Sequence, residues 1–205
     1  MTQNVSELER WESRFAASDY VFGTAPNTFL KSQAHRLSPG QKALALADGE
    51  GRNGVWLAEQ GLDVLSLDFS PNALKKARAL AAARGVSLRA ELADLSQWRW
   101  PVAEFDVIVA IFIQFADPQF RRQIFAGMKK ALKPGGLLLM QGYRPEQLNY
   151  RTGGPPQAEN LYTRDLLETA FGDFASVEIN EHDSMVDEGA GHAGLSALID
   201  FIGRK

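Results

Sequence analysis

The stretch Ala43-Leu-Ala-Leu-Ala-Asp-Gly-Glu-Gly-Arg-Asn-Gly54 decides the fold of this chain. It begins with an apolar run of strand length, continues through a glycine-rich turn and opens a helical pattern at Arg52. A second apolar run follows and ends at the carboxylate of Asp68. This order of strand, turn, helix and strand is typical of the first half of a nucleotide-binding α/β sheet. Adenosine-type cofactors bind at such turns.

The residue types in this stretch suit a ligand. Gly49 and Gly51 lack a Cβ atom, so the backbone can adopt unusual torsion angles and let a ligand approach closely. The following helix is expected to begin at Arg52-Asn53 with N–H groups that have no partner within the helix. Because ligands of open parallel sheets bind beyond the carboxyl ends of the strands, we expect the turn and Asp68 to face one crevice. A carboxylate there can accept hydrogen bonds from both hydroxyls of a ribose.

Two classes of enzyme fit this pattern. Gly49-Glu-Gly-Arg-Asn-Gly54 matches GxGxxG, and Asp68 lies nineteen residues after Gly49, close to the spacing of a dinucleotide fingerprint. The pattern alone supports an NAD(P)-dependent oxidoreductase about as well as a methyltransferase that uses S-adenosylmethionine. A length of 205 residues leaves little room for a separate substrate domain, which favours the methyltransferase.

Length and composition bound the organisation of the chain. Its 205 residues, 45% of them hydrophobic and 23% charged, suit one compact domain with a sizeable core. The net charge of −3 and the lack of a Lys/Arg block disfavour a nucleic-acid partner. The polar, acidic start of the sequence does not resemble a signal peptide, and no apolar run approaches the ~20 residues that span a bilayer. We therefore expect a cytoplasmic protein without a membrane partner.

Residue counts also restrict the chemistry. The chain has no cysteine, which excludes disulfides, a thiol nucleophile and cysteine-based zinc sites. Its three histidines, His35, His182 and His192, show no metal-ligand spacing. We therefore expect no metal site.

Apolar runs and turn residues predict alternating strands and helices. Strands are expected over residues 42–47, 62–67, 86–92, 105–112, 137–142, 174–182 and 195–204. Helices are expected over residues 52–60, 71–84, 118–132 and 163–171. The pattern predicts an α/β fold: a Rossmann-like, seven-stranded, mostly parallel sheet with one antiparallel edge strand and helices on both faces. A polar loop rich in glycine and proline, residues 144–160, is long enough to suggest a functional role.

Some conspicuous side chains also have a purely structural interpretation. We expect Trp98 and Trp100 to pack under a loop. Charged residues expected on a solvated helix face are Arg121, Arg122, Lys129 and Lys130. Asp94 is open to interpretation as a helix cap or a loop carboxylate, and aromatic residues of the N-terminal segment can simply bury area against the core.

Further motifs accompany the glycine turn in a defined order. They are Trp11-Glu-Ser-Arg-Phe15, Tyr20-Val-Phe-Gly-Thr-Ala-Pro-Asn27, Gly49-Glu-Gly-Arg-Asn53, Leu67-Asp-Phe-Ser-Pro71, Ala93-Asp94, Phe105-Asp-Val-Ile108, Leu132-Lys-Pro-Gly-Gly136, Tyr143-Arg-Pro-Glu-Gln147 and Gly153-Gly-Pro155. In order and spacing they resemble the class I S-adenosylmethionine-dependent methyltransferases. More narrowly, they resemble the TehB-like (tellurite-resistance-like) and thiopurine methyltransferase-like group. The resemblance covers nearly the whole chain.

The resemblance implies a single methyltransferase domain over residues 1–205. Residues 1–35 would form a helical lid segment, and residues 143–162 a substrate loop. The implied activity is methyl transfer from S-adenosylmethionine to a small molecule, with a chalcogen or thiol compound as one class of acceptor. The implied assembly is a monomer or a homodimer.

The resemblance also implies a set of cofactor-binding residues. It places the methionine end at the turn 49–53, the ribose at Asp68, the adenine beside Phe69 and Asp94, and the sulfonium above the end of the fourth strand. Asp48 would supply a partner for the amino group of the cofactor. The complete set is Asp48, Gly49, Glu50, Gly51, Arg52, Asn53, Asp68, Phe69, Ser70, Ala93, Asp94, Leu95, Ala110, Ile111 and Phe112.

At the acceptor end, the candidate catalytic residues are Gln114 and Tyr143. Close relatives often place histidine where this chain has Gln114. An amide cannot act as a base, so this departure suits an acceptor that arrives ionised. Candidate substrate-binding residues on the surrounding segments are Tyr20, Phe22, Arg144, Gln147 and His192.

A second departure lies at the start of the turn. Ala45 and Ala47 stand where relatives usually have an acidic residue and a first glycine. A Cβ atom at position 47 can press on the cofactor. Besides the methyltransferase, two alternatives stay open: a non-catalytic module that binds S-adenosylmethionine, and an NAD(P)-dependent oxidoreductase.

Overall fold

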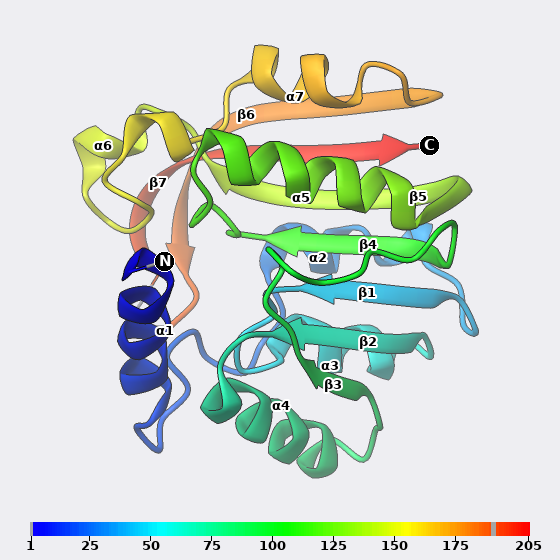
Figure 1. Cartoon of the computed structure of the whole chain (residues 1–205), viewed down its shortest axis with the longest axis vertical. Coiled ribbons are helices and arrows are strands. Elements are labelled where there is room, and N and C mark those ends of the chain that lie inside the picture. The colour runs from blue at the N-terminus through cyan, green and yellow to red at the C-terminus, as the bar shows by residue number, and fades with distance from the viewer. Residues whose placement is uncertain (1, 190–191) are drawn as a thin grey trace.

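Seven strands form one sheet in the computed structural model, which describes residues 2–189 and 192–205 (Figure 1). Met1, Ala190 and Gly191 lie outside the described residues. The strands are β1 (Lys42–Leu46), β2 (Asp63–Asp68), β3 (Arg89–Leu92), β4 (Phe105–Ile111), β5 (Leu132–Tyr143), β6 (Ser176–Asp187) and β7 (Ala193–Arg204). Their spatial order is β3-β2-β1-β4-β5-β7-β6.

Helices alternate with these strands along most of the chain. The α-helices are α1 (Thr2–Phe15), α2 (Thr28–Ser32), α3 (Arg52–Glu59), α4 (Pro71–Ala83), α5 (Pro118–Ala131), α6 (Gln147–Tyr150) and α7 (Arg164–Phe171). Two short 3-10 helices are η1 (Ala34–Arg36) and η2 (Ala158–Asn160). Among the described residues, no helix combines the length and the apolar character needed to cross a membrane.

The predicted fold class is confirmed. Strands β1 to β5 pair in parallel, whereas β7 runs antiparallel to both β5 and β6. The antiparallel strand therefore lies one position inside the outermost strand, where the sequence analysis expected it at the edge itself. Because β6 and β7 are joined by a hairpin turn, they can be neighbours only when they run in opposite directions.

The sheet is buried on both faces. Helices α5 and α7 cover one face through Ile124, Phe125 and Phe171, and α2 and α3 cover the other through Leu30 and Leu57 (Figure 1). Residues 107–110 of β4 are at most 2% exposed and are all apolar. A central strand with both faces covered requires such a continuous apolar run.

Helix starts follow the expected capping chemistry. Ser70 Oγ accepts a hydrogen bond from Ala73 N at 3.1 Å, with Pro71 as the first residue of α4. Asp117 caps α5 in the same way by accepting from the backbone N–H groups of residues 119 and 120. These caps fix where both helices begin beyond the carboxyl ends of their preceding strands.

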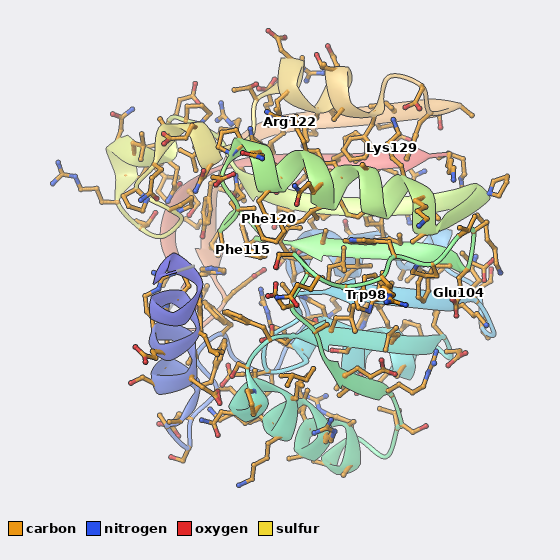
Figure 2. The ribbon with its side chains drawn as sticks, viewed as in Figure 1. Trp98, Glu104, Phe115, Phe120, Arg122 and Lys129 are labelled. Atoms are coloured by element: carbon orange, nitrogen blue, oxygen red, sulfur yellow. The ribbon has the colours of Figure 1, made fainter. Side chains whose placement is uncertain are left out.

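The loop before β4 carries the two tryptophans. The Trp98 and Trp100 rings meet edge to face at 4.8 Å, and both pack against the core (Figure 2). Gly127 of α5 makes room for Trp100, because a Cβ atom there would lie 2.2 Å from the indole. The packing role expected for both residues is therefore confirmed.

The solvated face predicted for α5 needs one correction. Arg122 and Lys129 lie along this helix in Figure 2, and Arg122 is exposed. Arg121 is only 7% exposed and donates through Nη1 to Glu159 O at 2.6 Å. Its guanidinium also lies 6.0 Å from the Tyr162 ring centroid. A carbonyl and a ring face thus stabilise the buried charge of Arg121, and both contacts tie α5 to the 143–162 segment.

The N-terminal helix lies across the edge at which the parallel strands end (Figure 1). Glu12 accepts hydrogen bonds from Ser70 Oγ at 2.6 Å and from Asn72 N at 3.0 Å, at the start of α4. Phe15 is 4% exposed, and its ring lies 3.5 Å from the position that a Cβ atom on Gly49 would take. One carboxylate and one aromatic ring therefore hold α1 over the glycine turn.

We predict that Glu12→Ala loosens α1 without unfolding the domain. The variant removes the acceptor for two N-terminal donors of α4, each bond to a charged group being worth about 1.5–3 kcal/mol. Amide hydrogen exchange over residues 7–15 should accelerate by about tenfold or more. Glu9→Ala, an exposed position of the same helix, serves as the control. Equal exchange in both variants would contradict the anchoring role of Glu12.

Candidate functional site

The turn after β1 has a backbone that glycine favours. Gly49 and Gly51 have φ angles of +58° and +87°. A Cβ atom on Gly51 would lie 2.5 Å from Ala77 Cβ, so glycine is also needed for the contact between α3 and α4. Ala47 adopts φ +46°, a left-handed conformation that costs an L-residue roughly 1–2 kcal/mol. The turn therefore keeps its shape at the position where relatives are expected to have glycine.

Asp68 connects this turn to the next helix. Its Oδ2 accepts from Gly49 N at 2.8 Å, and its Oδ1 accepts from Ser70 N at 2.9 Å. Burial raises the pKa of the carboxyl to about 6, against the effect of these backbone hydrogen bonds. Each oxygen of an ionised carboxylate keeps a further lone pair, so Asp68 can still accept from a ligand.

Asp48 is directed at the start of α3. It accepts from Gly54 N at 3.0 Å and from Ser66 Oγ at 2.9 Å. Burial raises the pKa of this carboxyl to about 7. Its role toward the amino group of a cofactor stays a prediction, since both visible contacts are made to the protein itself.

Charged side chains of the turn hold two distant segments over it. Glu50 is 3% exposed and accepts from Lys76 Nζ at 2.7 Å and Val21 N at 2.8 Å. Arg52 Nη2 donates to Glu188 Oε2 at 2.6 Å, with both side chains less than a tenth exposed. Through Val21 N, Glu50 fastens the segment after α1. Through Glu188, Arg52 fastens the turn between β6 and β7.

Asn27 extends this network. Its backbone N–H donates to Asn53 Oδ1 at 2.9 Å, and its Nδ2 donates to Gln141 Oε1 at 2.7 Å and to Glu188 Oε1 at 3.0 Å. Asn27 Oδ1 accepts from Leu30 N and caps α2. One asparagine therefore joins the N-terminal segment, the glycine turn, β5 and the β6–β7 turn.

Aromatic rings gather at the ends of β4 and β5. The Phe112 ring centroid lies 4.7 Å from that of Tyr143 and 4.4 Å from that of His192. Phe22 lies 4.5 Å from His192 on the other side. Phe112 has φ +55°, a left-handed conformation immediately after the last residue of β4. We call Phe22, Phe112, Tyr143 and His192 the aromatic box.

Three polar atoms around this box are buried without a hydrogen-bond partner: Arg52 Nη1, Tyr143 Oη and His192 Nδ1. Burial raises the pKa of the Tyr143 hydroxyl, so the phenol is protonated at neutral pH. Burial and the nearby charge of Arg52 lower the pKa of His192 to about 4, so its ring is neutral. The box thus combines aromatic rings with three buried polar atoms that have no hydrogen-bond partner among the described residues.

Three residues expected at the acceptor are hydrogen bonded within the protein, and their roles toward an acceptor stay predictions. Gln114 binds both backbone groups of Tyr143, with Oε1 accepting at 2.6 Å and Nε2 donating at 2.9 Å. Gln147 is 1% exposed and binds Ala197 N and Thr152 Oγ1. Arg144 donates to Leu198 O and pairs with Asp183. These residues position β5 and the 143–162 segment.

Tyr20 also lies away from the aromatic box. Its hydroxyl donates to Lys76 O at 3.1 Å, and its ring packs beside Leu80 of α4. The Lys76 ammonium lies 5.4 Å from the Tyr20 ring centroid. The side chain therefore fastens the N-terminal segment to α4, the packing role that the sequence left open.

At the adenine side, the predicted residues surround the ends of β2 and β3. Phe69 is half-buried beside Asp68, and Ala93 N donates to Asp68 O at 2.9 Å. Asp94 is exposed and accepts from Ser96 N at 2.9 Å within a turn, which is the loop carboxylate that the sequence left as an alternative. Leu95 is 8% exposed and belongs to the core under α5. Contacts of these residues with adenine stay a prediction.

Under the predicted sulfonium position, the side chains of Ala110, Ile111 and Phe112 lie in different places. Ala110 is completely buried and Ile111 is 9% exposed, with their side chains in the cores of opposite sheet faces. They can therefore offer backbone atoms to a ligand, but their side chains support the sheet. Phe112, after the bend, is the side chain that lines the site.

Sequence reasoning missed Glu12, Asn27 and Glu188. Glu12 and Asn27 lie within motifs that carried the family resemblance, but their roles depend on partners more than 50 residues away. Glu188 lies in an acidic, glycine-containing turn whose partner, Arg52, is 136 residues away in the chain. No local pattern identifies such pairs.

A groove of about 440 Å³ lies elsewhere, between α2 and the outer strands. Its lining includes His182, Asp200 and Ser184, which are hydrogen bonded to one another at 2.8–3.0 Å. It contains none of the glycine turn, Asp68 or the aromatic box. Because the glycine turn, Asp68 and the aromatic box lie at the carboxyl ends of the strands, we take that edge of the sheet as the candidate functional site.

With the geometry established, the family relation can be examined. Residues 43–136 match the family model described as "Methyltransferase domain". This segment is similar to methyltransferase domains. The match extends from β1 into β5, so it includes the glycine turn and Asp68, whereas α1, Tyr143 and His192 lie outside the matched residues.

Similar proteins agree with this assignment. An uncharacterized methyltransferase of Synechocystis sp. is 33% identical over 111 residues, which cover 53% of this chain and 50% of that protein. The chain spans half or less of the length of the first curated relatives that it matches. These matches favour the methyltransferase over the oxidoreductase.

Solved structures show the same fold. N-methyltransferase NodS from Bradyrhizobium japonicum, in complex with S-adenosyl-l-homocysteine, has a TM-score of 0.70 and 18% identity and covers 97% of each chain. TehB from Haemophilus influenzae has a TM-score of 0.67 and 18% identity, covering 97% of this chain and 67% of that one. At this level of identity the likeness shows the fold alone.

We predict that the ionisation of buried Asp48 lowers the free energy of unfolding as pH rises. Its folded-state pKa of about 7 lies above the ordinary value, so the protonated group favours folding below about pH 4, and this contribution is lost as pH rises through 7. Between about pH 5 and pH 8, wild type should lose about 2 kcal/mol relative to Asp48→Asn in denaturant unfolding.

Asp106→Asn is the control for this measurement. The pKa of Asp106 is lowered by its neighbours Lys133 and Lys42, although burial opposes them, so its titration ends below this pH interval. Parallel stability curves for wild type and Asp48→Asn would contradict a buried carboxyl that titrates near neutrality.

Proposed function

We propose that this chain is an S-adenosylmethionine-dependent methyltransferase that acts on a small molecule. The observation that carries the proposal is the pairing of Asp68 with the turn of residues 49–51 at the carboxyl edge of a parallel sheet. A cofactor with a ribose and an amino acid end suits a carboxylate and a bare glycine backbone at the same edge of the sheet.

The residues present fit each part of the cofactor. Asp68 would accept from the ribose hydroxyls, Phe69 would flank the adenine, and Asn53 would lie with the turn at the methionine end. Gly49 presents backbone without a Cβ atom, and the nearest ring is that of Phe15. When bound, the cofactor supplies a methyl group on positively charged sulfur, which is already activated for displacement.

The enclosure supports a small acceptor. The Phe22 ring, from the segment after α1, lies 4.5 Å from the His192 ring, next to the start of β7. A net charge of −3 offers no attraction for a nucleic-acid backbone. An acceptor must therefore fit between the rings or displace α1, which disfavours a folded macromolecule.

The protein contributes alignment and exclusion of water. Around the box, His192 has a pKa of about 4 and is a weak base, and Glu188 already accepts from Arg52, Asn27 and Thr28. An acceptor that arrives ionised needs no proton removal, and a chalcogen or thiol compound meets this condition. The narrower assignment to a TehB-like or thiopurine methyltransferase-like group rests on the motif order and on this lack of a strong base.

Calorimetric titration with S-adenosylmethionine, S-adenosylhomocysteine and NAD⁺ tests the proposed cofactor. We expect both sulfur nucleosides to bind and NAD⁺ not to bind. Asp68→Ala should weaken S-adenosylhomocysteine binding about 100-fold, because two hydrogen bonds to a charged group are worth about 3 kcal/mol or more.

The matched control is Asp106→Ala. Asp106 is also a carboxylate that binds a backbone N–H, from Lys42 at 2.9 Å, but it stands at the opposite edge of the sheet. The affinity of the Asp106→Ala variant for S-adenosylhomocysteine should equal that of wild type. NAD⁺ as the tighter ligand, or Asp68→Ala with normal affinity, would contradict the proposal.

A further inference from the structure

Unpaired polar atoms in the core are rare, and each needs an explanation because it lacks both water and a partner. Of the four such side-chain atoms among the described residues, three border the aromatic box and belong to Arg52, Tyr143 and His192. Arg52 is 7% exposed and Tyr143 is 1% exposed. Two of the three atoms thus belong to side chains that are more than nine-tenths buried.

The three groups come from elements that are far apart in sequence but fixed to one another. Arg52 begins α3, Tyr143 ends β5, and His192 immediately precedes β7. Arg52 Nη2 is held by Glu188, and Glu188 N donates to His192 O at 2.8 Å. The His192 and Tyr143 rings are perpendicular, with centroids 5.9 Å apart. The positions of the free atoms are therefore set by the fold.

Each of the three side chains can donate a hydrogen bond. An arginine is always charged and donates from Nη1, while a buried phenol retains its proton. A neutral imidazole can present Nδ1–H as a third donor.

Two arginines lie near the aromatic box. Arg52 is matched by Glu188, while Arg14 stacks over Phe22 with its guanidinium carbon 5.1 Å from the ring centroid. Glu50, the next carboxylate along the turn, is already paired with Lys76.

We propose that Arg52, Tyr143 and His192 form a subsite for an anionic group of the methyl acceptor, so that the enzyme selects small organic anions. This inference rests on the proposed function. The rings of the aromatic box exclude water from the same place, which strengthens each hydrogen bond to an anion. Selectivity follows because a neutral analogue of the acceptor leaves the buried donors unpaired.

One other anion competes for this assignment. The carboxylate of the cofactor itself has the chemistry that a buried arginine recognises. Saturation with S-adenosylhomocysteine separates the two sources, since that ligand brings its own carboxylate. An acceptor subsite stays open in the saturated protein, whereas a cofactor subsite is filled.

The experiment uses full-length protein saturated with S-adenosylhomocysteine and titrates it with formate and thiocyanate. The chain has three histidines, so the ring signals of His192 can be followed by NMR. We expect a saturable shift of the His192 signals with at least one of the two anions. Arg52→Gln should abolish this response.

Tyr143→Phe keeps the test decisive if Arg52→Gln fails to fold. The hydroxyl has no partner in the protein, so its removal should not lower the unfolding midpoint, while anion affinity should fall about tenfold, as expected for loss of one hydrogen bond to a charge. Tyr162→Phe is the matched control, because Tyr162 is equally buried but lies in the core beside Phe125. The anion affinity of the Tyr162→Phe variant should equal that of wild type.

Three results would overturn the inference: no saturable shift with either anion, anion binding that S-adenosylhomocysteine displaces, or equal affinities for Tyr143→Phe and wild type. The titration with S-adenosylhomocysteine alone comes first. Failure of the protein to bind it rejects the proposed function, whereas normal binding without an anion response rejects only the subsite.

Discussion

The carboxylate of Asp68 accepts one backbone N–H from the turn after β1 and another from the start of α4. A single side chain at the end of β2 thereby fixes the glycine turn and the next helix relative to the sheet edge. Ser70, held in place by this contact, binds Glu12 and so receives α1. The glycine turn, the start of α4 and the helix that covers them therefore depend on one buried acid. Its pKa of about 6 leaves it mostly ionised at neutral pH.

Polar contacts hold the cover in addition to apolar packing. Glu12, Glu50 and Glu188 each bind donors from a segment far away in the chain. Two of these contacts, Glu50 with Lys76 and Glu188 with Arg52, are buried ion pairs, which are costly to break singly because the remaining charge stays buried. They give the segments around the site defined positions. Such an arrangement suits an enclosure that must admit a cofactor and an acceptor.

The sequence predicted what depends on local chemistry. Pro71 after Ser70 fixed the start of α4, the apolar run 105–111 identified a central strand, and the glycine turn with Asp68 located the crevice. Side-chain direction was beyond such reasoning, as Gln114 illustrates. Its place at the end of β4 was expected, yet its amide turns to the backbone of Tyr143, because those groups are buried and need partners.

A crystal structure of the chain with S-adenosylhomocysteine tests the central claim most directly. The account predicts both ribose hydroxyls within hydrogen-bonding distance of the Asp68 carboxylate, with the sulfur end of the ligand facing the aromatic box. It would be contradicted by a ligand lodged elsewhere, such as in the groove between α2 and β6, or by an empty crevice at saturating ligand.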